Sequence, residues 1–167
     1  MTAHSSIRIR PARPSDETFL VALIPRLRAF GPGPLRSPEA MDRAEQDAVR
    51  RALADASPDT VLFVAELTGA DPLGTESPRP AGLALGESHT DYFTGERHGH
   101  LGILAVSEEA EGQGVGQALL AATESWARER GYRFLTLNVF DGNHRARSIY
   151  AKAGFRPDAI KYLKELG

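Results

Sequence analysis

The feature that most constrains this chain is a glycine-rich turn between an apolar segment and an amphipathic one. Residues 100–106 (HLGILAV) are mostly apolar and predict a buried strand. The following turn holds Gly112, Gly114 and Gly116, and residues 114–130 then carry apolar side chains at helical spacing. In such a turn, free backbone N–H groups at the start of a helix can approach an anion, which the helix dipole also favours. The sequence therefore predicts a strand–turn–helix unit with an anion-binding site, unless the turn is purely structural.

The spacing around these glycines argues against the two best-known nucleotide-binding turns. No Gly-Lys-Ser/Thr sequence follows, so the turn is not a P-loop. Gln117 stands where the third glycine of the dinucleotide-binding fingerprint would be, and no β-α-β unit begins the segment.

The rest of the chain predicts a mixed α/β domain in the order β-α-α-β-β-β-α-β-α-β, without internal repeats. Besides 100–106, strands are expected at 7–11, 60–67, 81–89, 133–140 and 160–166. Further helices are expected from Ser15 as N-cap with an interruption at Pro25, from Ser37 to about Ala54, and around 146–153 with Gly154 as the stop. Segments 30–35 and 68–80 predict loops. A chain of 167 residues has the length of one domain, so residues 1–167 are expected to form a single domain.

The composition excludes several kinds of partner and reaction. The chain has 20 Lys and Arg, 22 Asp and Glu, a formal net charge of -2 and no cysteine. The charge argues against a nucleic-acid or membrane-surface partner, and the missing cysteines exclude disulfides, thiolate metal sites and a cysteine nucleophile. No run of about 18 apolar residues exists, and the first residues lack a secretory pattern, so a cytoplasmic location is expected.

Two segments together carry a more specific signal, 104–120 (LAVSEEAEGQGVGQALL) and 138–157 (NVFDGNHRARSIYAKAGFRP). They resemble the GCN5-related N-acetyltransferase (GNAT) family, which has a Q/R-x-x-G-x-G/A pyrophosphate loop and, about twenty residues later, an Asn-x-x-Ala-x-x-x-Tyr-x-x-x-Gly-Phe helix. The second pattern is complete here in Asn143, Ala146, Tyr150, Gly154 and Phe155. The resemblance implies an α/β fold with a mixed central sheet of about six to seven strands and four helices, splayed between the fourth and fifth strands.

The resemblance also implies acetyl-CoA as cosubstrate. No metal is expected, because no Asp or Glu accompanies His98 and His100 in the same two-residue register. Backbone groups of Leu104 and Val106 would pair with the pantetheine arm like an added strand, and the amides of the turn would hold the pyrophosphate. Asn143 would contact the cofactor near its pantetheine, a role compatible with the common use of Asn as a helix N-cap. The expected cofactor-binding residues are Leu104, Ala105, Val106, Gly112, Gln113, Gly114, Val115, Gly116, Gln117, Asn138 and Asn143.

Glu111 departs from the family pattern, because it stands where the loop motif has Gln or Arg. A carboxylate there would repel a pyrophosphate. Two interpretations are open: either Glu111 turns to solvent and the backbone amides bind the phosphates unaided, or the cofactor binds more weakly than in other members.

For catalysis, the resemblance points to Tyr150 as the general acid that protonates the departing thiolate; the alternative is an apolar contact on the helix. Many relatives carry a glutamate on the strand before the turn, but HLGILAV has none. Glu87 and His100 are therefore the candidate bases, with bulk water as a further alternative. His89 and His98 are expected at solvated strand ends. Because no acetyl-cysteine can form, the amine is expected to attack the thioester directly in a ternary complex.

The leading function is thus an acetyl-CoA-dependent N-acetyltransferase, and the alternative is a non-catalytic acyl-CoA-binding or sensing domain. The acceptor is expected to be a small-molecule amine or a peptide or protein amine, and a homodimer is a candidate state because family members are often dimers. Segments 24–40 and 88–98 are expected to wall the acceptor side. Their acidic and aromatic residues would suit a cationic amine, and the residues considered are Phe30, Leu35, Glu87, Asp91, Tyr92, Phe93 and Glu96.

Overall fold

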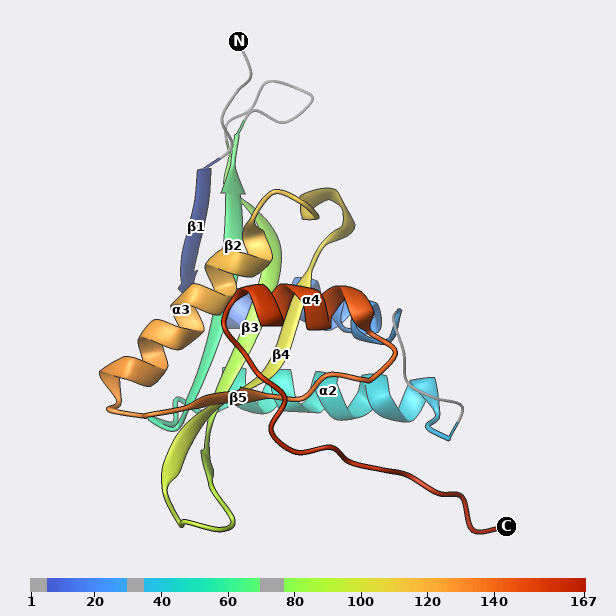
Figure 1. Cartoon of the computed structure of the whole chain (residues 1–167). Coiled ribbons are helices and arrows are strands. Elements are labelled where there is room, and N and C mark those ends of the chain that lie inside the picture. Colours follow the sequence, from blue (N-terminus) through green and yellow to red (C-terminus); the bar gives the residue numbers. More distant parts are fainter. Residues whose placement is uncertain (1–5, 30–34, 70–76) are drawn as a thin grey trace.

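A computed structural model describes residues 6–29, 35–69 and 77–167 of the chain. It has a five-stranded sheet in the order β1-β2-β3-β4-β5, with helices on both faces (Figure 1). The strands are β1 (Ser6–Pro11), β2 (Thr60–Thr68), β3 (Arg79–Thr90), β4 (Arg97–Val106) and β5 (Leu135–Leu137). The α-helices are α1 (Glu17–Leu23), α2 (Pro38–Ala54), α3 (Val115–Glu129) and α4 (His144–Lys152), and short 3-10 turns are η1 (Pro14–Asp16), η2 (Ile24–Arg28) and η3 (Glu108–Ala110).

The pairing of the last two strands creates the splay that the sequence predicts. β1 to β4 pair in antiparallel fashion, whereas β4 and β5 are parallel and share three residue pairs, ending at Leu101↔Leu137. β4 then continues to Val106 without a pair on the β5 side. The backbone of residues 102–106 is therefore paired with a strand on one side only.

Two apolar layers hold the helices to the sheet. On one face, Leu20 of α1 and Val49 of α2 are buried against Leu83 and Ile103. On the other face, Leu119 of α3 belongs to a second buried cluster. Burial of these apolar faces fixes α3, and with it the turn that precedes α3, relative to the end of β4.

The first helices begin and end partly as predicted. Ser37 caps α2 by accepting a hydrogen bond from the Ala40 N–H, and the helix covers Pro38–Ala54. α1 ends at Leu23 and continues as a 3-10 turn containing Pro25, so the predicted interruption is confirmed. The prediction of Ser15 as N-cap is wrong. Ser15 lies inside η1, and the Asp16 carboxylate accepts the Arg13 N–H instead, at 2.7 Å.

The sheet has one strand fewer than the six expected, and its last strand is shorter than predicted. The strand predicted at 133–140 is confined to β5, and the segment predicted as a strand at 160–166 is exposed and unpaired in the described part of the chain. An alternating sequence specifies which side chains share a face, but a strand forms only where a neighbouring edge offers hydrogen bonds. Most of the expected loops at 30–35 and 68–80, including Phe30, lies outside the described residues. None of the helices in the described ranges is long and apolar enough to cross a membrane.

Candidate functional site

The glycine turn lies where β4 ends and α3 begins. Gly112 and Gly114 have φ values of 75° and 86°, a left-handed conformation that side-chain-bearing residues rarely adopt. Ala118 N–H bonds to the Gly114 carbonyl, but the N–H groups of Gly112 and of residues 114–117 have no protein acceptor within the described ranges. A Cβ at Gly112 would meet nothing within 4 Å, so the turn faces open space. Free donors at a helix N-terminus beside open space fit a phosphate group.

Gln113 behaves differently from its neighbours in the turn. Its N–H bonds to the Ala110 carbonyl at 3.3 Å, and its side-chain Nε2 donates to the Glu109 carbonyl at 2.6 Å. The backbone N–H and one of the two side-chain N–H groups of Gln113 are thus used to shape the turn.

Glu111 is ion-paired rather than turned to solvent. Its carboxylate contacts Arg26 of η2, and Arg145 Nη1 of α4 lies 3.0 Å from its Oε2. These contacts, the Arg145 hydrogen bond foremost, hold the pKa of Glu111 below its usual range, so the carboxylate is ionised at neutral pH. The interpretation of Glu111 as a solvated side chain is therefore wrong, because two guanidinium groups from distant parts of the chain converge on it.

The free edge of β4 is partly used by the same arginine. Arg26 Nε donates to the Val106 carbonyl at 2.8 Å. A carbonyl oxygen has two lone pairs, so Val106 can still accept a second donor. Ala105 is buried in the core, whereas Leu104 and Val106 are half-buried. The edge of β4 that faces β5 can therefore bind an extended ligand that carries amide groups. One of its acceptors, the Val106 carbonyl, would be shared with Arg26.

Helix α4 brings two predicted residues beside this edge. The Asn143 side-chain oxygen accepts the Ala146 N–H at 3.1 Å, so Asn143 is an N-cap. Tyr150 is half-buried against the α3-side core, with its ring 5.8 Å from that of Phe155, and burial raises the pKa of its hydroxyl. That hydroxyl has no hydrogen-bond partner among the described residues. Asn138 lies directly after β5 and is exposed.

The two candidate bases are neighbours on β3 and β4. Glu87 is paired in register with His100, and His100 Nδ1 lies 2.9 Å from Thr136 Oγ1. Burial, followed by the nearby His89 and His98, lowers the pKa of His100 to about 4.

The neighbouring histidines are not both solvated as expected. The His98 side chain is only 9% exposed, and the His89 ring stacks on His100 with ring centres 4.3 Å apart. His89 Nε2 also lies 3.9 Å from Glu87 Oε2. In the described ranges, no group of three His, Asp or Glu side chains is arranged to hold a metal ion.

No contact in the described structure joins Tyr150 to Glu87 or His100. Tyr150 packs on the α3 side of the sheet. Glu87 lines a hollow of about 280 Å³ with the C-terminal end of α2, including Arg51 and Asp55. The unpaired stretch of β4 lies between the two groups.

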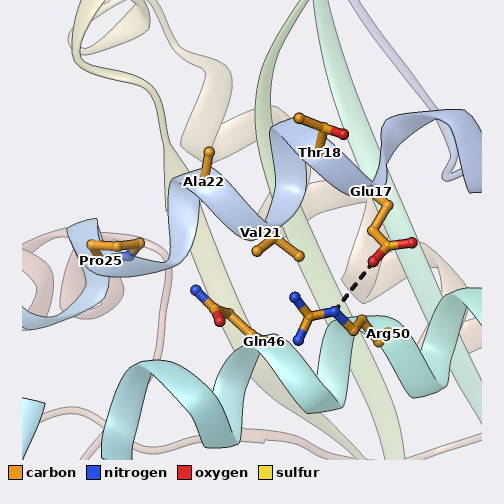
Figure 2. Close-up of a pocket in the computed structure, with 7 residues that line it drawn as sticks. All are labelled: Glu17, Thr18, Val21, Ala22, Pro25, Gln46 and Arg50. Atoms are coloured by element: carbon orange, nitrogen blue, oxygen red, sulfur yellow. Dashed lines mark hydrogen bonds and ion pairs between the residues drawn. The ribbon is translucent and has the colours of Figure 1, made fainter. Parts of the chain in front are cut away.

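A larger hollow of about 360 Å³ lies between α1 and α2 and contains none of the predicted site residues (Figure 2). Figure 2 shows Val21 and Gln46 facing it and the Glu17–Arg50 pair, whose Oε1 and Nε are 3.2 Å apart, closing one end. The predicted chemistry therefore does not lie in this hollow.

The acceptor wall predicted at 88–98 lies at the opposite end of β4 from the glycine turn (Figure 1). Tyr92 and Phe93 at this hairpin tip are 92% and 90% exposed, and Asp91 stabilises the tip by accepting the Phe93 and Thr94 N–H groups. At roughly 3.3 Å per residue, the length of β4 separates these side chains from the turn. They do not line the glycine turn.

Arg26 and Arg145 are the site residues that the sequence did not reveal. They lie 85 and 34 residues from Glu111, and no periodicity connects these positions. The unusual acid at position 111 was the one available signal, because a carboxylate beside a phosphate site needs a counter-ion.

Comparison with known proteins places this geometry in a family. The model of the acetyltransferase (GNAT) family matches residues 28–155, which is more than half of the chain. The chain belongs to the GNAT family of acetyltransferases. Two solved GNAT-fold neighbours cover nearly all of it: aminoglycoside N-acetyltransferase AAC(6')-Iy in complex with CoA (TM-score 0.67, 19% identity, 99% of each chain) and glucosamine-6-phosphate N-acetyltransferase from Arabidopsis thaliana (TM-score 0.64, 17% identity, 97% of this chain and 99% of that chain). At these identities the likeness shows the fold.

Sequence relatives match a shorter region. A mycothiol acetyltransferase from Amycolatopsis mediterranei is 38% identical over 63 residues, which are 38% of this chain and 21% of that protein. The N-acetyltransferase YycN of Bacillus subtilis, itself uncharacterized, is 35% identical over 63 residues, or 38% of this chain and 40% of its own length. The matched regions thus span between a fifth and two fifths of these relatives.

Proposed function

We propose that this GNAT chain is an acetyl-CoA-dependent N-acetyltransferase that acts on a primary amine by direct attack in a ternary complex. The observation that supports this best is the set of free N–H donors at the start of α3, next to a strand edge that lacks a neighbour over residues 102–106. The donors suit the pyrophosphate of CoA, and the edge suits its amide-bearing pantetheine arm.

In this proposal, different segments of the chain bind different parts of CoA. The amides of Gly112 and of residues 114–117 bind phosphate oxygens, and backbone groups of Leu104 and Val106 pair with the pantetheine amides. Asn143 caps α4 and presents the remaining side-chain N–H groups towards the arm. Gln113 shapes the turn through its backbone N–H and one side-chain N–H, and its second side-chain N–H remains available to a phosphate oxygen.

Tyr150 is the proposed general acid. The attack of the neutral amine on the thioester carbonyl forms the C–N bond, the C–S bond breaks, and the thiolate takes a proton from the phenol. The proton that the new amide nitrogen then loses returns to the phenolate through water, so Tyr150 is protonated again at the end. Phenol and thiol have pKa values near ~10 and ~8.5, so a complete transfer is slightly uphill. Burial raises the pKa of Tyr150 further, which keeps the hydroxyl protonated as a hydrogen-bond donor to the developing thiolate.

Glu87 is the proposed base for the acceptor ammonium, in preference to His100. His100 is buried and its Nδ1 already contacts Thr136 Oγ1, so an acceptor in solvent has little access to it. Glu87 is partly exposed and lines a hollow that solvent reaches, so it can take a proton from the acceptor and pass it to water.

A small-molecule amine is the proposed acceptor class, with a peptide or protein amine as the alternative. Solved neighbours of the same fold are named for aminoglycoside and glucosamine-6-phosphate acetylation. Glu87 offers a negative charge to a cationic amine on the α2 side of the sheet.

A homodimer is the proposed assembly. Of the exposed large apolar side chains, Phe134, Val139, Ile149, Ile160, Tyr162, Leu163 and Leu166 all belong to the last third of the chain. β5 lies at the end of the sheet with no further strand among the described residues, and the C-terminal segment runs away from it (Figure 1). Pairing of this segment with β5 of a second copy would bury its exposed apolar side chains and give the outer edge of β5 hydrogen-bond partners.

The test is thiol release when the purified chain is mixed with acetyl-CoA and a panel of amines that includes aminoglycosides, amino sugars, polyamines and short peptides. We expect acceptor-dependent release of CoA. Tyr150→Phe should lower kcat by about 10²-fold, since it removes the proton donor and keeps the ring, and Glu87→Gln should lower kcat/KM. Tight CoA binding without turnover on any acceptor would instead support the non-catalytic sensing domain.

A further inference from the structure

Charged side chains that are far apart in the sequence meet beside the glycine turn. The Glu111 carboxylate contacts Arg26 through one oxygen and Arg145 through the other. Glu108 lies 3.6 Å from Arg26 but is 84% exposed, so solvent screens its charge. Two guanidinium groups therefore converge on one half-buried carboxylate, next to N–H donors that have no acceptor.

The two arginines are held very differently. Arg26 also donates from Nε to the Val106 carbonyl, and its side chain is only 30% exposed. Arg145 is 52% exposed, and its contact within the described ranges is with Glu111 alone. Arg26 is thus fixed to the end of β4, whereas Arg145 can change partner at the cost of a single ion pair.

Resting on the proposed binding of CoA, we infer that Arg145 exchanges partners: it pairs with Glu111 in the free protein and with a phosphate of CoA in the complex, while Arg26 keeps Glu111 paired. The exchange leaves no carboxylate without a cation, because Arg26 stays in place. Phosphate and carboxylate oxygens compete for the same guanidinium donors, and the two phosphates of the CoA pyrophosphate together carry two negative charges against one on Glu111. Helix α4 would thereby supply the cation that other family members place in the turn itself.

The exchange gives Glu111 and Arg145 opposite effects on binding. Arg145 contributes a charge-assisted contact in the complex, so its loss weakens binding. Glu111 competes with the ligand for Arg145, so removing its charge strengthens binding, and only while Arg145 is present. A double-mutant cycle therefore distinguishes this exchange from two independent charge effects.

The experiment is calorimetric titration of the full chain with CoA. We expect Arg145→Ala to weaken CoA binding about 10-fold and Glu111→Gln to strengthen it about 3-fold. In the double variant, Glu111→Gln should not change the affinity beyond the loss that Arg145→Ala causes. Arg147→Ala is the matched control, because Arg147 lies on the same helix but pairs with Asp141 at 2.7 Å, and it should stay within about 2-fold of the wild type. Arg145→Lys should recover part of the loss, and added salt should reduce every difference.

The outcomes separate this inference from the proposed function. If the wild type does not bind CoA, the proposed function fails. If it binds CoA and Arg145→Ala binds equally well, the proposed function stands and the exchange is wrong. Weaker binding by Glu111→Gln would also overturn the exchange, since Glu111 would then position Arg145 rather than compete for it.

Discussion

At the scale of single residues, this chain sets its charges by ion pairing and burial rather than by residue type. Glu111 would oppose a phosphate ligand, yet two guanidinium groups pair with it and offset its charge. His100 would titrate near neutrality, yet burial and two neighbouring histidines lower its pKa to about 4. Residue type alone reveals neither the two cations beside Glu111 nor the lowered pKa of His100.

His100 makes a prediction for the pH dependence of stability. Its folded-state pKa of about 4 lies below the ordinary value of 6.5, so between these values the unfolded chain binds more protons and stability falls as the pH falls. Compared with His100→Asn, the wild type should lose about 2 kcal/mol of unfolding free energy between pH 7 and pH 5. Urea unfolding at both pH values measures this difference. His144→Asn, on the exposed face of α4, should track the wild type, and equal losses in all three proteins would contradict the prediction.

At the scale of elements, the site depends on how closely α3 packs on the sheet. Gly82 of β3 lies under this contact: a Cβ there would be 2.8 Å from the Ala105 carbonyl and 3.0 Å from Leu119 Cδ1. The close approach holds α3, and the turn before it, against β4. A buried ion-pair network joins β1, β2 and η1 in a similar way, with Arg10 Nε 2.7 Å from Glu66 and Arg10 Nη1 2.7 Å from Asp16.

Gly82→Ala should therefore destabilise the fold. The added methyl group meets backbone of the neighbouring strand, which cannot move as a side chain can, so we expect a loss of about 1–3 kcal/mol. For a domain of this size the Tm should fall by roughly 5 °C, measured by thermal unfolding. Gly142→Ala is the control, because its Cβ would meet nothing within 4 Å. A Tm within about 1 °C of the wild type for Gly82→Ala would show that α3 adjusts freely.

At the scale of the whole molecule, the sheet ends in a strand of three residues while an apolar segment of the same chain stays exposed. Ile160, Tyr162 and Leu166 are 72%, 87% and 83% exposed. A short exposed strand edge and a free segment of alternating sequence are complementary in hydrogen bonding and in burial.

Removing residues 158–167 should therefore abolish the proposed dimer. We expect the full chain to sediment as a dimer at tens of micromolar concentration and the shortened chain as a monomer, measured by analytical ultracentrifugation. Leu163→Asp should act in the same direction without shortening the chain. Tyr92→Ser removes an equally exposed apolar group at the β3–β4 hairpin and should leave the dimer intact. A monomeric wild type, or a dimeric shortened chain, would be inconsistent with exchange of C-terminal segments.

Local patterns determined much of this molecule. Ser37 and Pro38 specified the start of α2, and the spacing from Val115 to Trp126 specified the buried face of α3, because capping and helical periodicity depend on neighbours within a turn. Gly112 and Gly114 specified the turn through their backbone freedom. The paired motifs sufficed for the family and for the position of the proposed phosphate site.

Features that depend on contacts between residues far apart in the sequence were determined only by the tertiary structure. The segment 160–166 has a strand-like sequence but no paired edge, so its alternation did not make it a strand. Ser15 lost the capping position to Asp16, which the buried Arg10 requires. Arg26 and Arg145 reach Glu111 only because the ends of η2 and α4 meet at the turn, and an ion pair between such residues leaves no local pattern. The sequence by itself thus determined the backbone of the proposed phosphate site, whereas the fold alone decided which cations lie beside it.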